Sequence, residues 1–111
     1  NDETAAQIAC LTGAKRLLIL STLDGVYRDI TDPSSLIREI TGTREEVLNK
    51  IEEYKSHCHG ASRKGANGAA AKLEYIKPCV KAGIEVIIGS AAHDIRNVLN
   101  GSVPRTRIFA E

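Results

Sequence analysis

RLLILSTLDGVY, residues 16–27, is the most informative segment of the chain. Its first six residues are a short apolar run with hydrophobic side chains on both faces, which is typical of a strand buried on both sides of a parallel sheet. Asp24-Gly25 is a strong turn signal just beyond that strand. Because open α/β sheets bind ligands outside the carboxyl ends of their strands, the segment predicts both a sheet and the position of a site.

Similar elements alternate along the rest of the chain. Thr43 and Glu46 form a capping-box pattern before an amphipathic stripe, and Pro78 should kink or divide a later helix. This alternation predicts a three-layer α/β/α sandwich with a mostly parallel sheet. We expect helices at about 4–11, 43–55, 69–82 and 93–99, strands at 16–21, 36–40, 84–88 and 106–109, and a polar, glycine-rich loop at 56–68.

Composition narrows the class of protein. The 111 residues are 42% hydrophobic and 26% charged with a net charge of +1, as in one ordinary globular domain. Neither bulk charge nor aromatic content favours a nucleic-acid partner, and no apolar run is long enough for a membrane span. The three cysteines, Cys10, Cys58 and Cys79, have no paired spacing, so we expect reduced thiols and a cytoplasmic protein.

The start of the chain and the size of the sheet bear on its organisation. The sequence opens with Asn1-Asp2, without Met, and runs directly into a helical pattern, which indicates a piece of a longer protein. A sheet of about three strands meant to be covered on both faces leaves an edge that favours a partner. We therefore expect a homo-oligomer or a missing half.

Three segments carry candidate site residues. In the first, hydroxyls after the strand could bond a ribose or phosphate, and Gly25 could let the backbone approach a flat ring. The other interpretation is an ordinary turn. The candidates in this segment are Ser21, Thr22, Asp24, Gly25 and Tyr27.

The second segment, residues 64–72, is a glycine loop that leads into a helix. The free amides and positive dipole end of such a helix suit a phosphate, and Lys72, one turn inside, could reach the same anion. No Gly-Lys-Ser/Thr sequence is present, so it is not a P-loop. A flexible linker with a solvated lysine is the other interpretation. The candidates are Gly65, Asn67, Gly68 and Lys72.

The third segment is Asn1-Asp2-Glu3, where a carboxylate at a helix start is either a simple cap or an organiser of cations around a phosphoryl group. His57-Cys58-His59 has no second pair of ligands at zinc spacing, so we predict no metal site there.

In combination the three segments resemble the amino-acid kinase family, and within it the glutamate 5-kinases. Those proteins carry Asn-Asp, then Thr-Asp-x-x-Gly-Leu-Tyr after a buried strand, then Gly-Thr-Gly-Gly-Met-x-Thr-Lys at a helix start. The matching stretches here are residues 1–2, 21–27 and 65–72, and 105–109 loosely match a closing Gly-Thr-Arg/Leu-Phe.

The resemblance implies a partial amino-acid kinase fold, with residues 1–111 as its C-terminal, nucleotide-binding part. It implies ATP-dependent phosphorylation of an amino-acid carboxylate, glutamate or similar, with Mg²⁺ accompanying ATP and no covalent intermediate. Asn1 would contact the substrate and Asp2 would organise the catalytic lysines. The candidates of the first two segments would form the ATP site, in which Lys72 neutralises phosphate charge.

The sequence also departs from the family pattern. Thr22 stands where the family has Asp. In the glycine loop, Ala66, Asn67 and Ala69 replace the family's Thr, Gly and Met. In the closing motif, Arg105 replaces Gly. These differences leave open a kinase for acetylglutamate or UMP, or a non-catalytic nucleotide or amino-acid sensing domain. In acetylglutamate kinases the alignment would put Glu3 in the catalytic position. The lysine and glycine loop of the family's first half do not occur here, so the chain is predicted to be inactive alone.

Overall fold

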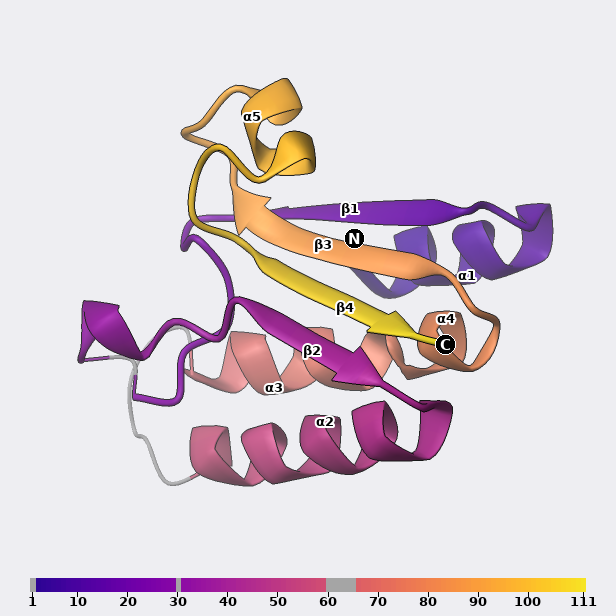
Figure 1. Cartoon of the computed structure of the whole chain (residues 1–111), viewed down its shortest axis with the longest axis horizontal. Helices are drawn as coiled ribbons and strands as arrows, with labels where there is room; N and C mark the ends of the chain where they lie inside the picture. The colour runs from indigo at the N-terminus through magenta and orange to yellow at the C-terminus, as the bar shows by residue number, and fades with distance from the viewer. Residues whose placement is uncertain (1, 30, 60–65) are drawn as a thin grey trace.

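Helices and strands alternate around a four-stranded sheet (Figure 1). The computed structural model describes residues 2–29, 31–59 and 66–111. In chain order the elements are α1 (Asp2–Thr12), β1 (Arg16–Ser21), the 3₁₀ helix η1 (Pro33–Ser35), β2 (Glu39–Gly42), α2 (Arg44–His59), α3 (Ala66–Tyr75), α4 (Lys77–Lys81), β3 (Glu85–Ser90), α5 (Ile95–Asn100) and β4 (Thr106–Ala110).

The strands lie in the order β1-β3-β4-β2. β1 pairs with β3 and β2 pairs with β4 in parallel, whereas β3 and β4 are antiparallel. The predicted α/β class with a mostly parallel sheet is confirmed. Between β3 and β4 the chain forms α5, which spans six residues, about 9 Å, and does not run back along β3. The chain therefore enters β4 at the end where β3 stopped.

One face of the sheet packs against α1, α2, α3 and α4, where the main hydrophobic core lies. Alternate residues of the strands point into it, and every one of these side chains is almost completely buried. The core residues of the sheet are Leu17, Ile19, Ile40, Val86, Ile88, Ile108 and Ala110, and the helices meet them with Ala6, Ala9, Val47, Ile51, Leu73, Ile76 and Val80.

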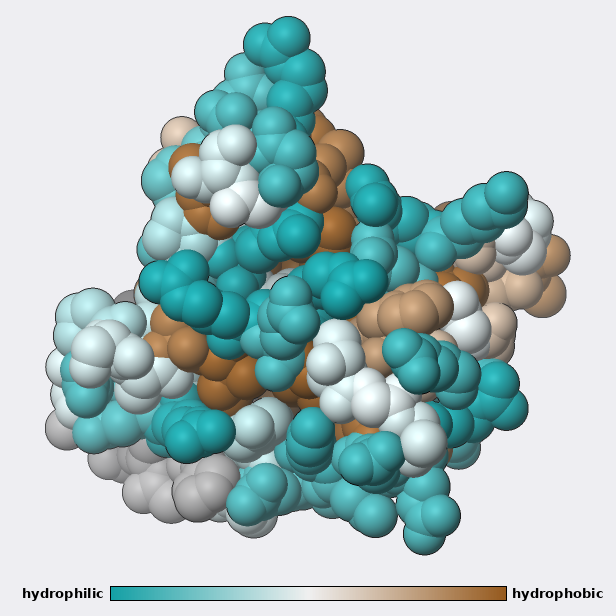
Figure 2. Space-filling model, viewed as in Figure 1, coloured by the Kyte–Doolittle hydropathy of each residue, from teal (hydrophilic) through white to brown (hydrophobic). Residues whose placement is uncertain are grey.

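The opposite face carries α5 as its only covering helix among the described residues. Gly89 of β3 allows this contact, because a Cβ there would lie 2.4 Å from Cγ1 of Val98. The remainder of the face is mixed: Glu85 bridges Arg16 and Arg107 from the neighbouring strands, and Leu20 is 39% exposed. Figure 2 shows hydrophobic surface between hydrophilic side chains on this side of the sheet. The third layer of the sandwich is therefore thin in this chain.

Most helix ends follow the sequence signals. The Thr43 N–H donates to Oε1 of Glu46 at 3.0 Å and the Glu46 N–H donates to Oγ1 of Thr43 at 3.2 Å, which confirms the capping box. Pro78 lies in the first turn of α4 and separates α4 from α3 as expected.

The predicted loop at 56–68 is wrong at both ends, because α2 continues to His59 and α3 begins at Ala66. No Pro or Gly lies between Tyr54 and His59, so these polar residues continue the helix, and Gly60 follows its last residue in the sequence.

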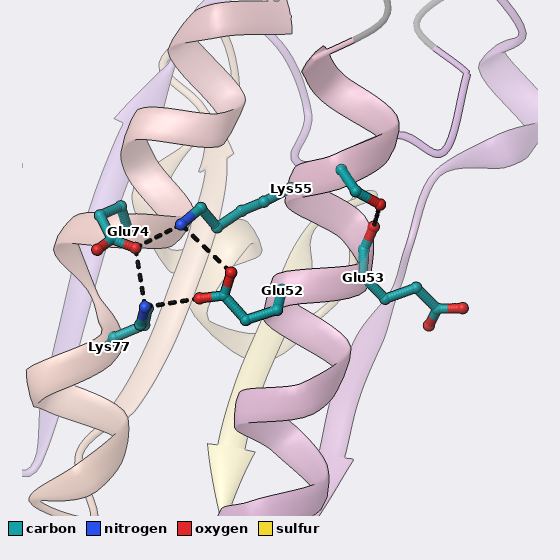
Figure 3. A network of polar contacts seen from close by, with 6 residues as sticks. Glu52, Glu53, Lys55, Glu74 and Lys77 are labelled. Carbon is teal, nitrogen blue, oxygen red and sulfur yellow. Dashed lines mark hydrogen bonds and ion pairs between the residues drawn. The ribbon is translucent and has the colours of Figure 1, made fainter.

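A network of charged side chains joins α2 to α3 and α4 (Figure 3). The Lys55 ammonium lies 2.5 Å from a carboxylate oxygen of Glu74 and 3.6 Å from one of Glu52. Lys77 contacts the same two carboxylates at 3.0 and 2.6 Å. Glu53, one residue along α2, points away from the network. The four-residue network therefore adds ion pairs to the apolar packing of the three helices.

Candidate functional site

β1 and β3 end side by side, each in a serine whose side chain shapes the turn that follows. Ser21 and Ser90 are register partners. The Ser21 Oγ accepts the N–H of Leu23 at 3.2 Å, and the Ser90 Oγ accepts the N–H of Ala92 at 3.1 Å. The predicted site residue Ser21 thus lies at the carboxyl edge of the parallel pair, where α/β folds bind ligands. Thr22 follows it and is exposed.

The two turns are joined by a residue that the sequence did not single out. Nε2 of His93, in the turn after β3, lies 3.1 Å from Oδ1 of Asp24, in the turn after β1. Both side chains are about one-third exposed, at 35% and 31%. In the sequence, the only signal for this contact is that Asp24 and His93 each follow a buried strand, since parallel strands finish at the same edge of a sheet.

Gly25 has a packing role. A Cβ at Gly25 would lie 2.2 Å from Oγ1 and 2.9 Å from the backbone nitrogen of Thr106. The next residue, Val26, donates its N–H to Oγ1 of Thr106 at 2.9 Å, and the Thr106 hydroxyl donates to the carbonyl of Ile37 at 2.6 Å. Thr106, the threonine of the closing motif, occupies the space beside Gly25. A flat ring cannot approach the backbone on that side, so the predicted ligand would have to contact the turn from another side.

Tyr27 forms the start of a closed loop. It makes an isolated antiparallel bridge with Leu36, and the Ile37 N–H donates to the carbonyl of Val26 at 2.8 Å. The expected return strand at 36–40 is therefore a bridge at Leu36 followed by β2 from Glu39. Burial, and then the charge of Asp24, raise the pKa of the Tyr27 phenol, so this hydroxyl remains protonated at neutral pH.

A cavity of about 330 Å³ lies beside this loop, between residues 28 and 34–39 on one side and α2 on the other. Its walls include Arg28, Ser35, Arg38 and Tyr54. The guanidinium of Arg28 lies 5.7 Å from the centre of the Tyr54 ring, a cation–π arrangement. The cavity therefore combines an aromatic wall with two guanidinium groups.

The predicted helix starts lie at the same end of the molecule as these turns. α1 and α3 run opposite to β1 and β3, so their N-terminal ends point toward the edge where the two strands finish (Figure 1). Asp2 is the first residue of α1, whereas Asn1 lies outside the described residues.

In the second predicted segment, Gly65 also lies outside the described residues. Asn67 and Gly68 belong to the first turn of α3 and not to a loop. Lys72 lies in the last turn of that helix, so it is nearly two turns from its start and not the single turn expected. The Cα of Lys72 therefore lies about 9 Å along the helix axis from that of Ala66.

The described part of the chain shows neither a cluster of metal ligands nor a membrane-spanning helix. Within 2–29, 31–59 and 66–111, no three His, Cys, Asp or Glu side chains gather as metal ligands. The side chains of His57, Cys58 and His59 lie outside what the structure describes. In the same part of the chain, no helix combines the length and apolar character needed to cross a bilayer.

Comparison with known proteins relates this geometry to a family. A model of the amino acid kinase family matches residues 1–90. The glutamate 5-kinase of Clostridium acetobutylicum is 32% identical over 103 residues, covering 90% of this chain and 37% of that enzyme. The glutamate 5-kinase of Aliivibrio fischeri is 34% identical over 116 residues, covering 98% of this chain and 29% of that enzyme. The chain thus spans less than two-fifths of the length of these relatives.

Solved structures agree on the fold. Carbamate kinase from Giardia lamblia, bound to AMP-PNP, superposes with a TM-score of 0.68 and 21% identity, covering 96% of this chain and 30% of that one. UMP kinase from Ureaplasma parvum superposes with a TM-score of 0.61 and 18% identity, covering 97% of this chain and 39% of that one. The sheet, the helices on it and the sequence match lead to one conclusion: the chain belongs to the amino acid kinase family.

Proposed function

We propose that this chain is the nucleotide-binding part of an ATP-dependent kinase whose acceptor is an amino-acid carboxylate, glutamate or a close analogue. The observation that carries the proposal is the joint placement of the turns after β1 and β3, linked through Asp24 and His93, at the end toward which α1 and α3 point their amino termini. Helix amino termini favour phosphate through their free amides and dipole. The family membership supplies the reaction class.

In this proposal the triphosphate lies near the start of α3, and the nucleoside extends toward the cavity lined by Arg28 and Tyr54. The cavity volume, about 330 Å³, falls within the range of small-ligand pockets. Phosphoryl transfer depends on positioning and on stabilising the charge of the transferring group. The ammonium of Lys72 would neutralise that charge, Asp2 would orient cationic groups, and Asn1 would contact the amino-acid substrate.

Mg²⁺ would accompany the nucleotide. The described residues do not fit a protein-only Mg²⁺ site, since Asp24 already pairs with His93 and no carboxylate cluster lies near it. Mg²⁺ typically keeps phosphate oxygens and waters as most of its ligands. When bound, it would neutralise charge on the triphosphate.

Nucleotide binding is tested by calorimetric titration of the 111-residue chain with MgATP, comparing Lys72→Ala with Lys81→Ala. Lys81 is an exposed lysine in the last turn of α4, at the opposite end of the molecule. We expect Lys72→Ala to weaken binding roughly tenfold or more, as loss of a charge-assisted contact does, and Lys81→Ala to leave it unchanged. Equal affinities of the two variants would remove Lys72 from the site.

The acceptor is tested with a chimera in which these residues replace the matching part of the Clostridium acetobutylicum glutamate 5-kinase. We expect the chain alone to bind nucleotide without turnover, and the chimera to phosphorylate glutamate in preference to acetylglutamate or UMP. A folded chimera that binds MgATP and phosphorylates none of the three would favour the sensing domain over the kinase.

A further inference from the structure

Two of the cysteines that are distant in sequence are neighbours in space. Cys10 on α1 and Cys79 on α4 are 69 positions apart, and their sulfur atoms lie 3.6 Å from each other. The Cys79 thiol also lies 3.5 Å from the carbonyl oxygen of Ala6. The scattered spacing of the cysteines therefore gave no sign of this pair.

The two sulfurs differ in access. Cys79 is completely buried, whereas Cys10 is half-buried. Cys10 lines a groove of about 430 Å³ between α1 and the α3–α4 segment, whose walls include Leu11, Tyr75 and Pro78. A small solute in this groove reaches Cys10 first, with Cys79 directly behind it.

Burial, together with the neighbouring Cys10 thiol, raises the pKa of Cys79 to about 12. Cys79 is therefore a protonated thiol at neutral pH and a poor first nucleophile, because the thiolate is the reactive form. The order of reaction follows from this asymmetry: Cys10 reacts with the oxidant, and Cys79 resolves the product.

We propose that Cys10 and Cys79 form an oxidisable dithiol, in which a hydroperoxide modifies Cys10 and Cys79 then closes a disulfide between α1 and α4. In the first step the Cys10 thiol loses its proton, its thiolate attacks one peroxide oxygen and the O–O bond breaks, leaving a sulfenic acid, while the departing hydroxide or alkoxide takes up a proton as water or an alcohol. In the second, the Cys79 sulfur attacks the sulfenic sulfur, the S–O bond breaks, and the departing hydroxide takes the Cys79 proton as water. Two thiols are oxidised and one peroxide is reduced.

The packing of α1 allows the sulfurs to close the remaining distance. The core side of this helix consists of small residues, Ala6 and Ala9, while Ile8 and Leu11 are exposed at 54% and 86%. A helix held by alanines can shift by the roughly 1.5 Å that separates two thiols in contact from an S–S bond, with little loss of buried surface. The disulfide would fix α1, the helix that begins at Asp2, against α4.

The test uses the 111-residue chain with Cys58→Ser, which leaves only the pair. We expect dilute hydrogen peroxide to lower the mass by about 2 Da, to remove both titratable thiols and to join the two cysteine peptides in a tryptic digest. Dithiothreitol should reverse all three changes. Closing so long a loop should also raise Tm by roughly 5–15 °C.

Single-cysteine variants identify the roles. With Cys79→Ser, Cys10 should accumulate as a sulfenic acid trapped by dimedone, and with Cys10→Ser, Cys79 should stay reduced at the same peroxide concentration. In the chain with both cysteines, oxidation of Cys10 to sulfinic acid without a cross-link, or disulfides only between chains, would overturn the proposal. So would two thiols that peroxide leaves unchanged.

Discussion

The hydroxyl of Thr106 is completely buried and joins three segments that are distant in sequence. It accepts the Val26 N–H and donates to the Ile37 carbonyl. Since an unpaired buried backbone group is destabilising, Thr106 holds the turn after β1 and the segment before β2 against the first residue of β4. Thr106, a residue of the closing motif, thus fixes the position of the turn that carries the candidate site.

Thr106→Val should destabilise the chain by about 2–4 kcal/mol, because it leaves one buried donor and one buried acceptor without partners. Thr106→Ser keeps the hydroxyl and loses one methyl group, so its effect should be closer to about 1 kcal/mol. Urea unfolding followed by circular dichroism measures both. If serine proves as destabilising as valine, methyl packing and not hydrogen bonding is the main contribution of this residue.

Gly25→Ala should also destabilise the chain, by about 1–3 kcal/mol, because the added methyl group overlaps the backbone nitrogen and Oγ1 of Thr106. Thr22→Ala, in the same turn but exposed, is the matched control and should change the unfolding free energy by less than about 0.5 kcal/mol. The same urea titrations apply. A neutral Gly25→Ala would mean that the turn can move away from β4.

At the scale of elements, the network of Glu52, Lys55, Glu74 and Lys77 connects α2 with α3 and α4. Hydrogen bonds from Lys55 and Lys77 lower the pKa of Glu74 from 4.5 to about 2. The Glu74 side chain is 50% exposed, so solvent screens the pairs and their contribution is modest despite the large shift.

We therefore expect Glu74→Gln to lower the unfolding free energy by at most about 1 kcal/mol at pH 7. Because the folded-state pKa lies below the unfolded one, this contribution is complete above about pH 4.5 and is lost as the pH falls toward 2. Unfolding titrations at several pH values test this, with Glu53→Gln as the control, since Glu53 points away from the network. A difference between wild type and Glu74→Gln that persists at pH 2 would contradict it.

Local signals in the sequence predicted the helices and strands well where a capping or breaking residue defines their ends. The capping box at Thr43 and the break at Pro78 depend only on neighbouring residues, and both are present. The extension of α2 to His59 was missed because the apolar stripe ends at Tyr54 and the residues that follow are polar, although Gly60 comes directly after the last helical residue in the sequence. The antiparallel direction of β4 also has no local signal, because it depends on how the chain turns after α5.

The candidate site was predictable only in part, for the same reason. Ser21 and Asp24 follow a recognisable buried strand, so their position at the sheet edge could be inferred. The long-range contacts of this turn could not be inferred: His93 meets Asp24 from 69 positions away, and Thr106 meets Val26 from 80 positions away, both only through tertiary packing. The pairing of Cys10 with Cys79 depends on the packing of α1 against α4 and is likewise a long-range property.

For the molecule as a whole, β1 lies at an edge of the described sheet, and its outward face is little covered. A strand with unpaired backbone groups and an exposed leucine favours pairing with another chain. We propose that the 111-residue chain self-associates through this edge, with the β1 strands of two copies side by side.

Leu20→Lys should shift the chain toward monomer, because two copies would place like charges near each other across the new strand pair. Ile8→Lys, which changes an exposed apolar residue of α1, is the control and should leave the association unchanged. Light scattering coupled to size-exclusion chromatography over a range of concentrations measures both. A wild-type chain that stays monomeric at high concentration would end the proposal.

The reversal of direction between β3 and β4 has a practical consequence. Since β4 runs opposite to β1 and β3, the chain finishes at the end of the molecule far from the candidate site (Figure 1). A biotin attached after Glu111 would therefore tether the domain to a sensor surface with the candidate site facing the solution.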